Sequence, residues 1–351
     1  KMKNKNLPFV SVIILNYNGL DYTIDCLKSL KKIDYSSHEI IVIDNNSKNN
    51  EADVIQKKFP NIKVIKAEKN CGFAGGNNLG YKHAKGEYIV LLNNDTLVDK
   101  NWLKELVKVF KDPSVAIVQS RMFAKYKKED YYYDRNNGQS IIGTPILNKE
   151  EYDQNGVKDI FIAVGCSLIY PSKLFEEPFD EDYFFNGEDT ALAFRAKLNG
   201  YKIKEAKNSI VYHEGNVTTN KVSNLNTFLK ERNYLMNLLI FYEAKSLFKL
   251  TPIMLASIIF KNAYHPTKVH IRFKSYLWLL TNYKKISEKR KRMQKLRKIN
   301  DSQLFKKMSY KFIDPETTSS NIAKKTSKMI NSFSHRYCSL IGIKTQEFYK
   351  D

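Results

Sequence analysis

The sequence predicts an α/β protein: a doubly wound, mixed but mostly parallel sheet, followed by a helical, basic C-terminal region. Three observations lead to this prediction. Short apolar strand patterns alternate with helical patterns over residues 10–110, which is typical of a parallel sheet covered by helices on both faces. Polar residues follow the ends of successive strands, and the positive charge is concentrated in residues 221–351.

Unbroken apolar runs rich in β-branched residues predict four buried strands, at residues 10–15, 39–43, 62–67 and 88–92. Apolar residues at helical spacing predict helices between and after them, at residues 21–32, 52–59, 76–83 and 102–110. A strand at 164–170, a helix from 189 that is closed by Gly200, and a further strand follow. The pattern is lost between residues 120 and 160, where we expect a polar loop or a lid.

Composition limits the class of protein. A chain of 351 residues with 42% hydrophobic residues can bury a large core, as one large domain plus an appendage. Its four cysteines have no paired spacing, which argues against a disulfide framework or a zinc site and suits a reducing cytoplasm. No signal-peptide pattern is visible in the polar first residues.

The charge divides the chain into a near-neutral body and a basic tail. Residues 1–220 carry 31 Lys and Arg against 29 Asp and Glu, whereas residues 221–351 carry 27 against 8, a net charge of +19. Such a tail favours a polyanion, either nucleic acid or an anionic membrane surface. We therefore expect a domain boundary near residue 220.

Four successive strands end in amides, glycines and single carboxylates: NYNG (16–19), DNNSKNN (44–50), NCGFAGGNNLG (70–80) and NNDT (93–96). Any one of these segments could be an ordinary turn or helix cap. The carboxyl ends of parallel strands meet at one edge of the sheet, where open α/β sheets bind ligands. The density of polar residues at all four ends therefore predicts a ligand crevice.

The ligand is not predicted by a standard phosphate-binding loop. The first strand is followed by one glycine, which argues against a dinucleotide fingerprint, and no P-loop pattern is present. Gly72, Gly75 and Gly76 follow the third strand and allow close approach of a ligand. Asn77 and Asn78 add amide donors that could reach a diphosphate or a sugar hydroxyl.

Five segments, taken in order, resemble the inverting family 2 glycosyltransferases with the GT-A fold, and their rhamnosyltransferase-like branch in particular. They are VSVIILNYNGLDYTIDCLKSL, EIIVIDNNSKN, NCGFAGGNNLGYKHAKGEYIVLLNNDT, FDEDYFFNGEDTALAFRAKLNGYKI and VYHEG, within about residues 8–216. The resemblance implies a catalytic domain at 1–220, with a nucleotide-sugar half at 8–119 and an acceptor half at 120–220.

The resemblance also implies where the donor binds. It places the base and ribose of a nucleoside-diphosphate sugar, with a UDP or dTDP donor favoured, at Leu15, Asn16, Tyr17, Asp44 and Asn45. An Asp or Asn there can hydrogen-bond the imide edge of a uracil or thymine ring. The rest of the expected nucleotide-sugar site comprises Gly72, Phe73, Asn77, Asn78 and Asn94.

NND at 93–95 resembles the family's D-x-D signature, with Asp95 in the third position. The resemblance implies that Asp95 binds Mn²⁺ or Mg²⁺, which bridges the donor diphosphate and neutralises the leaving group. Asn93 replaces the first Asp of the signature and lowers the negative charge of the site. His213 follows a predicted strand and is expected to complete the metal site or to contact the diphosphate.

Inverting transfer needs a base that takes the proton from the attacking hydroxyl. Asp189 matches the family's base, and the adjacent Glu188 is the substitute candidate. Two acids can also lie at a helix N-terminus simply because the helix dipole favours them. Asp95 lies in the expected nucleotide-sugar half and Asp189 in the expected acceptor half of one crevice. Their presence together favours the catalytic interpretation.

These observations predict a metal-dependent hexosyl- or deoxyhexosyltransferase. It would move one sugar to a saccharide or polyprenyl-linked saccharide acceptor in cell-surface glycan synthesis. The Q-x-x-R-W motif of processive family members is absent from the sequence. Two alternatives remain: a sugar nucleotidyltransferase of related fold, and a glycan- or membrane-binding module whose catalytic site has decayed.

The basic tail predicts a partner of its own. Residues 284–298 hold nine basic side chains and one acid, while the apolar stretch at 250–260 is too short to span a bilayer. Apolar and basic helices together favour docking on an anionic membrane surface, which implies a cytoplasmic enzyme held at the inner face of the plasma membrane. A solvated helix face and a homo-oligomer contact are the alternatives, and nucleic acid is not expected.

Overall fold

The computed structural model describes residues 7–125, 137–148, 150–215, 223–264, 266–313 and 321–349. The chain forms two compact units. Unit 1 comprises residues 1–134, 150–192 and 202–221, and unit 2 comprises residues 135–149, 193–201 and 222–351. Two short segments of the expected body therefore belong to unit 2, and the expected boundary near residue 220 stays a prediction.

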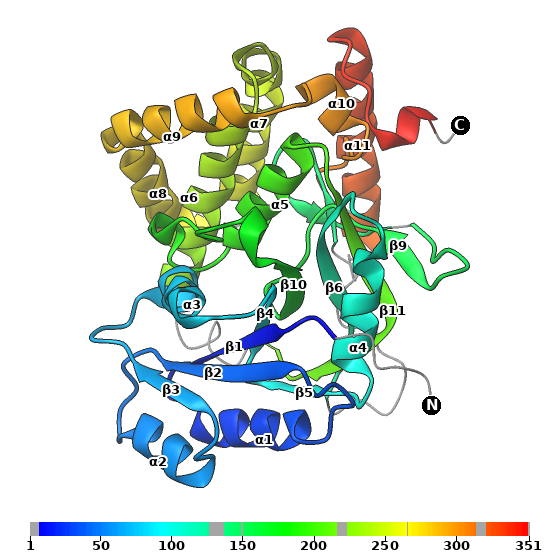
Figure 1. The fold of residues 1–351 in the computed structure, drawn as a ribbon. Helices are drawn as coiled ribbons and strands as arrows, with labels where there is room; N and C mark the ends of the chain where they lie inside the picture. The colour runs from blue at the N-terminus through cyan, green and yellow to red at the C-terminus, as the bar shows by residue number, and fades with distance from the viewer. Residues whose placement is uncertain are drawn as a thin grey trace. The chain divides into compact units, whose positions relative to one another are not determined.

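Unit 1 is built on a mixed sheet whose described strands have the order β3-β2-β1-β4-β10-β6-β11-β5, with β9 paired to β11. The neighbours from β3 to β4 are parallel, as are β6 and β11, whereas β10 runs antiparallel between β4 and β6. The α/β fold class predicted from sequence is thus confirmed (Figure 1). The strands are β1 (Val10–Asn16), β2 (His38–Asp44), β3 (Lys63–Lys66), β4 (Tyr88–Asn93), β5 (Thr96–Val98), β6 (Val115–Ala124), β9 (Val157–Asp159), β10 (Ser167–Pro171) and β11 (Lys202–His213).

Helices cover both faces of this sheet: α1 and α2 lie on one face and α3 on the other (Figure 1). Short 3₁₀ turns η1 (Val109–Lys111), η2 (Ser172–Leu174) and η3 (Glu181–Tyr183) complete the connections. The helix α5 begins in unit 1 and ends in unit 2. The helices are α1 (Leu20–Leu30), α2 (Glu51–Lys58), α3 (Gly72–His83), α4 (Trp102–Lys108) and α5 (Glu188–Leu198).

Strand β1 is mostly apolar, with an unbroken apolar run at residues 12–15, because both of its faces are covered. Val12 and Ile14 belong to the core that α1 and α4 share. Leu15, on the opposite face, meets α3 at Gly76, where an added Cβ would lie 2.3 Å from Leu15 Cδ1. Gly80, one turn later, meets the same strand in the same way. The two glycines therefore let α3 approach the end of β1 closely.

The structure differs from the sequence prediction in two places. Helix α3 begins at Gly72 rather than near residue 76. Strand β6 occupies residues 115–124, which had been assigned partly to a polar loop. The buried Gln119 and Ser120, followed by the partly exposed Arg121, interrupt its apolar run, and for this reason the apolar pattern does not reveal the strand. Residues 126–136 of the expected loop lie outside the described residues.

Unit 2 is mainly helical, with a small two-stranded sheet of β7 (Gly138–Gln139) and β8 (Pro145–Ile146). None of its described helices, nor any in unit 1, is long and apolar enough to cross a membrane. Its helical elements are α6 (Ser223–Phe241), α7 (Ala244–Tyr264), η5 (Pro266–Lys268), α8 (Val269–Thr281), α9 (Tyr283–Leu296), α10 (Asp301–Phe305), α11 (Asn321–Leu340) and η7 (Gln346–Tyr349).

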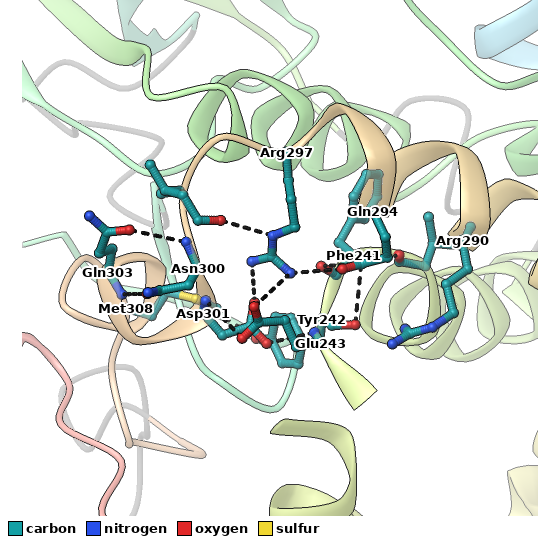
Figure 2. A network of polar contacts seen from close by, with 12 residues as sticks. Phe241, Tyr242, Glu243, Arg290, Gln294, Arg297, Asn300, Asp301, Gln303 and Met308 are labelled. Atoms are coloured by element: carbon teal, nitrogen blue, oxygen red, sulfur yellow. Dashed lines mark hydrogen bonds and ion pairs between the residues drawn. The ribbon is translucent and has the colours of Figure 1, made fainter. Parts of the chain in front are cut away.

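Part of the basic segment 284–298 is used inside unit 2 (Figure 2). Arg290 Nη1 donates to Leu239 O at 2.5 Å, and Gln294 Nε2 donates to the last carbonyls of α6. Arg297 forms an ion pair with the buried Asp301, with Nη2 and Oδ1 2.6 Å apart. These side chains satisfy the C-terminal carbonyls of a helix and a buried acid, so Arg290 and Arg297 hold the unit together.

Candidate active site

The polar strand ends come together at one edge of the sheet. The register aligns Asn16 with Asp44 on β2 and Leu15 with Asn93 on β4. Strand β1 lies between β2 and β4, so the chain reverses its direction of travel across the sheet there. This switch point is where an open α/β sheet leaves a crevice for a ligand.

Asn16 is fully buried and organises this edge. Its Nδ2 donates to Asp44 Oδ1 at 2.8 Å and to Glu51 Oε2 at 2.9 Å, while its Oδ1 accepts from Thr23 Oγ1 at 2.7 Å. Its amide is thus used within the protein, which favours positioning of Asp44 over direct contact with a base. Tyr17, the next residue, is 39% exposed and is available to a ligand.

Glu51 was missed by sequence reasoning. It is buried, and its Oε2 also accepts from the Gly19 backbone N–H at 3.1 Å. As an acid in the first turn of α2 it looked like a residue placed there by the helix dipole. The structure adds a second carboxylate beside Asp44, with Asn16 donating to both.

Asn45 joins the end of β2 to the start of α3. Its Nδ2 donates to Gly72 O at 3.0 Å and its Oδ1 accepts from the Cys71 N–H at 2.9 Å. Gly72 has a positive φ of 70°, and a Cβ there would lie 2.4 Å from Phe184 O. Phe184 itself has a φ of 61°, an unfavourable conformation for a bulky residue. The loop before α5 is therefore packed tightly on the start of α3.

The side chains of the two asparagines of α3 make hydrogen bonds within the protein. Asn78 Nδ2 donates to Phe179 O at 2.8 Å, and Asn78 Oδ1 accepts from the Phe179 N–H at 3.2 Å. Asn77 Nδ2 donates to Phe73 O at 2.9 Å within the helix. Both residues are buried, and their expected contact with a diphosphate stays a prediction.

Two further expected donor-site residues lie in protein contacts. Asn94 Nδ2 donates to Thr23 Oγ1 at 2.9 Å, which turns this side chain toward α1. The Phe73 ring packs on Phe179, with centroids 5.7 Å apart, and covers Gly165, where an added Cβ would lie 2.7 Å from Phe73 Cζ. Phe73 therefore forms one wall around Gly165.

Asp95 and His213 lie side by side although 118 positions separate them. Strand β5 pairs with the end of β11 and aligns Thr96 with His213. His213 Nε2 lies 3.2 Å from Asp95 Oδ1 and 3.5 Å from Asn93 Nδ2. Burial lowers the pKa of His213, but Cys166 and the Asp95 carboxylate raise it, and the net pKa is about 11.

Asp95 and His213 fit a metal ion that takes its remaining ligands from a bound substrate. A carboxylate oxygen is a metal-type donor, and the imidazole nitrogen becomes one when a cation displaces the proton that the raised pKa keeps on it. Both side chains are nearly buried. Within the described ranges, no group of three or more His, Cys, Asp or Glu side chains could hold an ion without other ligands. The remaining ligands of a hard cation would be phosphate oxygens and water, so affinity should depend on the nucleotide.

Glu188 and Asp189, at the start of α5, lie in a different environment from Asp95 and His213. Burial raises the pKa of Glu188 well above its usual value, and the neighbouring Asp189 charge adds to the shift. Burial also raises the pKa of Asp189, while hydrogen bonds from Thr190 and from the Gly165 backbone lower it. Glu188 Oε2 is buried without a hydrogen-bond partner in the described protein. Of the two acids, Asp189 is the one whose carboxylate accepts hydrogen bonds, from Thr190 N and Oγ1, and these offset part of the rise in its pKa.

The segment Gly165–Cys166 connects the two carboxylate centres. Cys166 O accepts from the Asn93 N–H at 2.9 Å, and its side chain contacts His213. The backbone of the preceding Gly165 lowers the pKa of Asp189. Cys166 thus contacts the metal-type pair, and Gly165 lies close enough to the base candidate to affect its pKa. No sequence motif pointed to this segment, which had been assigned as plain strand.

Residues 11–179 match the family model described as glycosyl transferase family 2. Residues 11–179 therefore form a glycosyl transferase family 2 domain. The chain is 26% identical to the glycosyltransferase GlyG of Streptococcus pneumoniae over 55% of this chain and 66% of that protein. It is also 26% identical to the O-antigen chain rhamnosyltransferase RfbN of Salmonella typhimurium, over 60% of this chain and 67% of RfbN. The prediction of a glycosyltransferase enzyme is confirmed at the level of the family.

A solved structure supports the fold of this chain. The crystal structure of GalNAc-T7 with UDP, GalNAc and Mn²⁺ superposes with a TM-score of 0.53 at 19% identity, covering 68% of this chain and 49% of that one. At this identity the likeness bears on the fold alone, and it confirms the expected GT-A type. The chain spans about half the length of that neighbour and 66% of GlyG.

Proposed function

We propose that this protein is an inverting, metal-dependent glycosyltransferase that moves one sugar from a nucleoside-diphosphate donor to a saccharide hydroxyl. The observation that carries the proposal is the Asp95–His213 pair, whose Oδ1 and Nε2 lie 3.2 Å apart, in the same unit as the Asp189 carboxylate. Direct displacement at the sugar needs a cation at the leaving diphosphate and a base at the acceptor. Unit 1 holds candidates for both groups.

Asp95 and His213 would hold Mn²⁺ or Mg²⁺ together with the donor diphosphate. When bound, the ion would neutralise the charge that develops on the leaving nucleoside diphosphate. GalNAc-T7, of similar fold, was solved with UDP and Mn²⁺, which favours a divalent cation and is compatible with a UDP or dTDP donor. The exposed Tyr17 and the Asp44 carboxylate, held by Asn16, would face the base and ribose.

Asp189 would take the proton of the acceptor hydroxyl as the new glycosidic bond forms. A base must be ionised at working pH, and hydrogen bonds from Thr190 and Gly165 favour the ionised form of Asp189. Glu188 has no such donors on Oε2 and would keep its proton. Environments that separate the pKa values of two acids commonly assign their roles.

The two alternatives from the sequence have less support. A sugar nucleotidyltransferase would need a basic phosphate-binding motif near the end of β1, where Asn16, Tyr17 and Asn18 stand instead. A decayed binding module is favoured by Asn93 alone, in place of the first acid of the D-x-D signature, and it would not need a pair of desolvated carboxyls at α5. Similarity to RfbN, an O-antigen chain rhamnosyltransferase, favours an acceptor in cell-surface glycan synthesis, either a saccharide or a polyprenyl-linked saccharide.

The test is release of nucleoside diphosphate from a panel of UDP-, dTDP- and GDP-sugars, with Mn²⁺, Mg²⁺ or EDTA. We expect turnover with one donor class, loss of turnover in EDTA, and recovery on addition of the metal. The anomeric configuration of the product, read by NMR, should be opposite to that of the donor. Metal-independent turnover or a retained configuration would refute the respective part of the proposal.

We also propose that the enzyme works on the cytoplasmic face of the plasma membrane, with unit 2 against anionic lipid. Residues 244–298 hold 15 Lys and Arg and one acid. On α8, Phe273 is 64% exposed and Leu280 is 71% exposed, and Tyr283 at the start of α9 is 61% exposed. Apolar side chains of this kind enter the headgroup boundary, while each nearby Lys or Arg adds about 1 kcal/mol.

Because Arg290 and Arg297 hold unit 2 together, the membrane test must leave them intact. Four exposed cations of α9 remain for charge reversal to Glu: Lys284, Lys291, Arg292 and Lys295. Reversal of four exposed unit 1 lysines is the matched control: Lys57, Lys58, Lys82 and Lys104. We expect the α9 variant to lose co-sedimentation with anionic vesicles and the control to keep it. Equal binding to neutral and anionic vesicles, or none to either, would favour an oligomer contact or a solvated face.

A further inference from the structure

A chain of hydrogen bonds crosses the carboxyl edge of the unit 1 sheet, from the start of α2 to the turn after β4. Asn16 Nδ2 donates to Glu51 Oε2 at 2.9 Å and to Asp44 Oδ1 at 2.8 Å. Thr23 Oγ1 donates to Asn16 Oδ1 at 2.7 Å and accepts from Asn94 Nδ2 at 2.9 Å. Asn16 and Thr23 are fully buried. The chain therefore joins the part of the site expected to face the base to the residue that precedes the proposed metal ligand.

The two carboxylates at one end give this chain its direction. An ionised carboxylate only accepts hydrogen bonds, so Asn16 turns its NH₂ group to the two acids and its carbonyl oxygen to Thr23. A hydroxyl has a single hydrogen, and Thr23 donates it to Asn16. Thr23 therefore only accepts from Asn94, which fixes the orientation of the Asn94 amide. Asp44 is itself expected to face the donor, so Glu51 is the acid that serves the chain alone.

Glu51 also holds the turn between β1 and α1. Its Oε2 accepts from the Gly19 backbone N–H at 3.1 Å. The Asn18 N–H donates to Ser47 Oγ at 2.9 Å, and Asn18 Oδ1 accepts from the next backbone N–H of that loop at 2.8 Å. Asn18 has a φ of 50°, a left-handed conformation that asparagine adopts more readily than most residues. The turn that carries the exposed Tyr17 is therefore tied to the loop and helix that follow β2.

We propose that Glu51 is a positioning residue for the nucleoside diphosphate of the donor. Through the Asn16 amide it directs the chain that reaches Asn94, and through Gly19 it holds the turn that presents Tyr17. Groups that are already fixed lose less freedom when a ligand binds, so fixing them raises affinity. The inference rests on the proposed function, since it takes this edge of the sheet as the donor site. Glu51 touches neither donor nor acceptor in this scheme and acts through its hydrogen-bond partners.

Glu51→Ala removes both hydrogen bonds at once. Calorimetry with UDP, dTDP and GDP in Mn²⁺ should show that affinity for the nucleotide that the parent binds falls about tenfold, the size of losing a buried hydrogen bond to a charged group. The donor KM should rise by a similar factor while kcat stays close to parental, because the base and the acceptor are untouched. Glu51→Gln keeps a carbonyl oxygen that accepts the same two hydrogen bonds, so it should restore most of the affinity. A lower melting temperature with parental affinity in Glu51→Ala would overturn the proposal.

Glu39→Ala is the matched control for general damage. Glu39 lies at the start of β2, at the opposite edge of the same sheet. Its Oε1 also accepts from one side chain and one backbone group, Ser11 Oγ at 2.6 Å and the Lys85 N–H at 2.7 Å. The control should melt at a lower temperature and bind the nucleotide like the parent. Equal losses of affinity in Glu39→Ala and Glu51→Ala would overturn the specific role of Glu51.

Thr23 tests the same chain if Glu51→Ala does not fold. Thr23→Val keeps the shape of the side chain and removes the hydroxyl, whereas Thr23→Ser keeps the hydroxyl. We expect Thr23→Val to bind the nucleotide more weakly than the parent and Thr23→Ser to bind it nearly as well. Equal affinities in the two variants would overturn the proposed chain.

Nucleotide binding by the parent separates this inference from the proposed function. If the parent binds none of UDP, dTDP and GDP with Mn²⁺, the proposed function has failed and the inference fails with it. If the parent binds one of them and Glu51→Ala binds it equally well, the positioning role alone is overturned. Glu51→Ala combined with Thr23→Val should lose less affinity than the two single losses multiplied, because both act through the Asn16 amide. Independent losses would overturn the shared chain.

Discussion

The two carboxylate centres of unit 1 differ in what surrounds them. Asp95 lies 3.2 Å from His213, and together they present a carboxylate and an imidazole. Glu188 and Asp189 have only each other and a few hydrogen-bond donors, and burial raises the pKa of both. A carboxylate beside a nitrogen ligand suits a cation, whereas a desolvated pair of acids suits proton transfer. The environment, rather than the type of residue, separates the two roles.

The largest effect is expected from a substitution in the Asp95–His213 pair. Asp95→Ala removes the only carboxylate proposed for the metal, so metal-dependent binding of the donor should be abolished while the fold survives. Calorimetry with UDP- or dTDP-sugars, with and without Mn²⁺, measures this directly. Asp53→Ala is the control, since Asp53 is 64% exposed and pairs only with Lys66. Parental metal and nucleotide affinity in Asp95→Ala would mean that the assignment is wrong.

A substitution in the Glu188–Asp189 pair should slow the chemical step and leave donor binding intact. Asp189→Asn should lower turnover by about 10²- to 10⁴-fold, with donor affinity close to parental because the base faces the acceptor. Glu188→Gln is the matched change at the neighbouring position and should retain more activity. If instead Glu188→Gln is the inactive variant, the base is Glu188. Weak donor binding in Asp189→Asn would move Asp189 to the donor site.

His213→Gln tests whether His213 is itself a ligand of the metal ion. Loss of an outer partner of a metal ligand commonly costs 10- to 100-fold in affinity, so loss of a direct ligand should weaken Mn²⁺-dependent donor binding at least about tenfold. Titration of Mn²⁺ at fixed donor concentration measures the change. A variant with unchanged metal dependence and a weaker nucleotide affinity would indicate that His213 contacts the diphosphate instead.

The smallest expected effect concerns stability at the second centre. Glu188 keeps its proton in the folded protein at pH values where the unfolded chain, with its ordinary pKa of 4.5, has lost it. Stability from this group is therefore complete below that value and falls as pH rises toward the folded pKa. Glu188→Gln stays neutral, so it should melt about 2–4 °C above the parent at pH 8 and close to it at pH 5. Parallel melting curves at both pH values would contradict the raised pKa.

Much of this protein could be predicted from the sequence. Strands β1, β2 and β4 each contain an unbroken apolar run of four or five residues because both faces of the sheet are covered, and the local pattern detects that burial directly. Asp95 and Asp189 were placed by motifs that lie close to the ends of predicted elements. Strand β6 could not be found in this way, because buried Gln119 and Ser120 look like loop residues until their partners are known.

What the tertiary structure decided is which buried polar groups meet. Asn16 meets Glu51 across 35 positions, His213 meets Asp95 across 118, and Arg290 turns from a surface cation into a helix cap. A local pattern records that a residue is polar or apolar, but hydrogen bonding in a core depends on strand order and register. The sequence by itself therefore determined the fold class and the kinds of groups at the crevice. Only the folded structure determined their partners, and through them which amides bind protein and which carboxyl of the Glu188–Asp189 pair accepts hydrogen bonds.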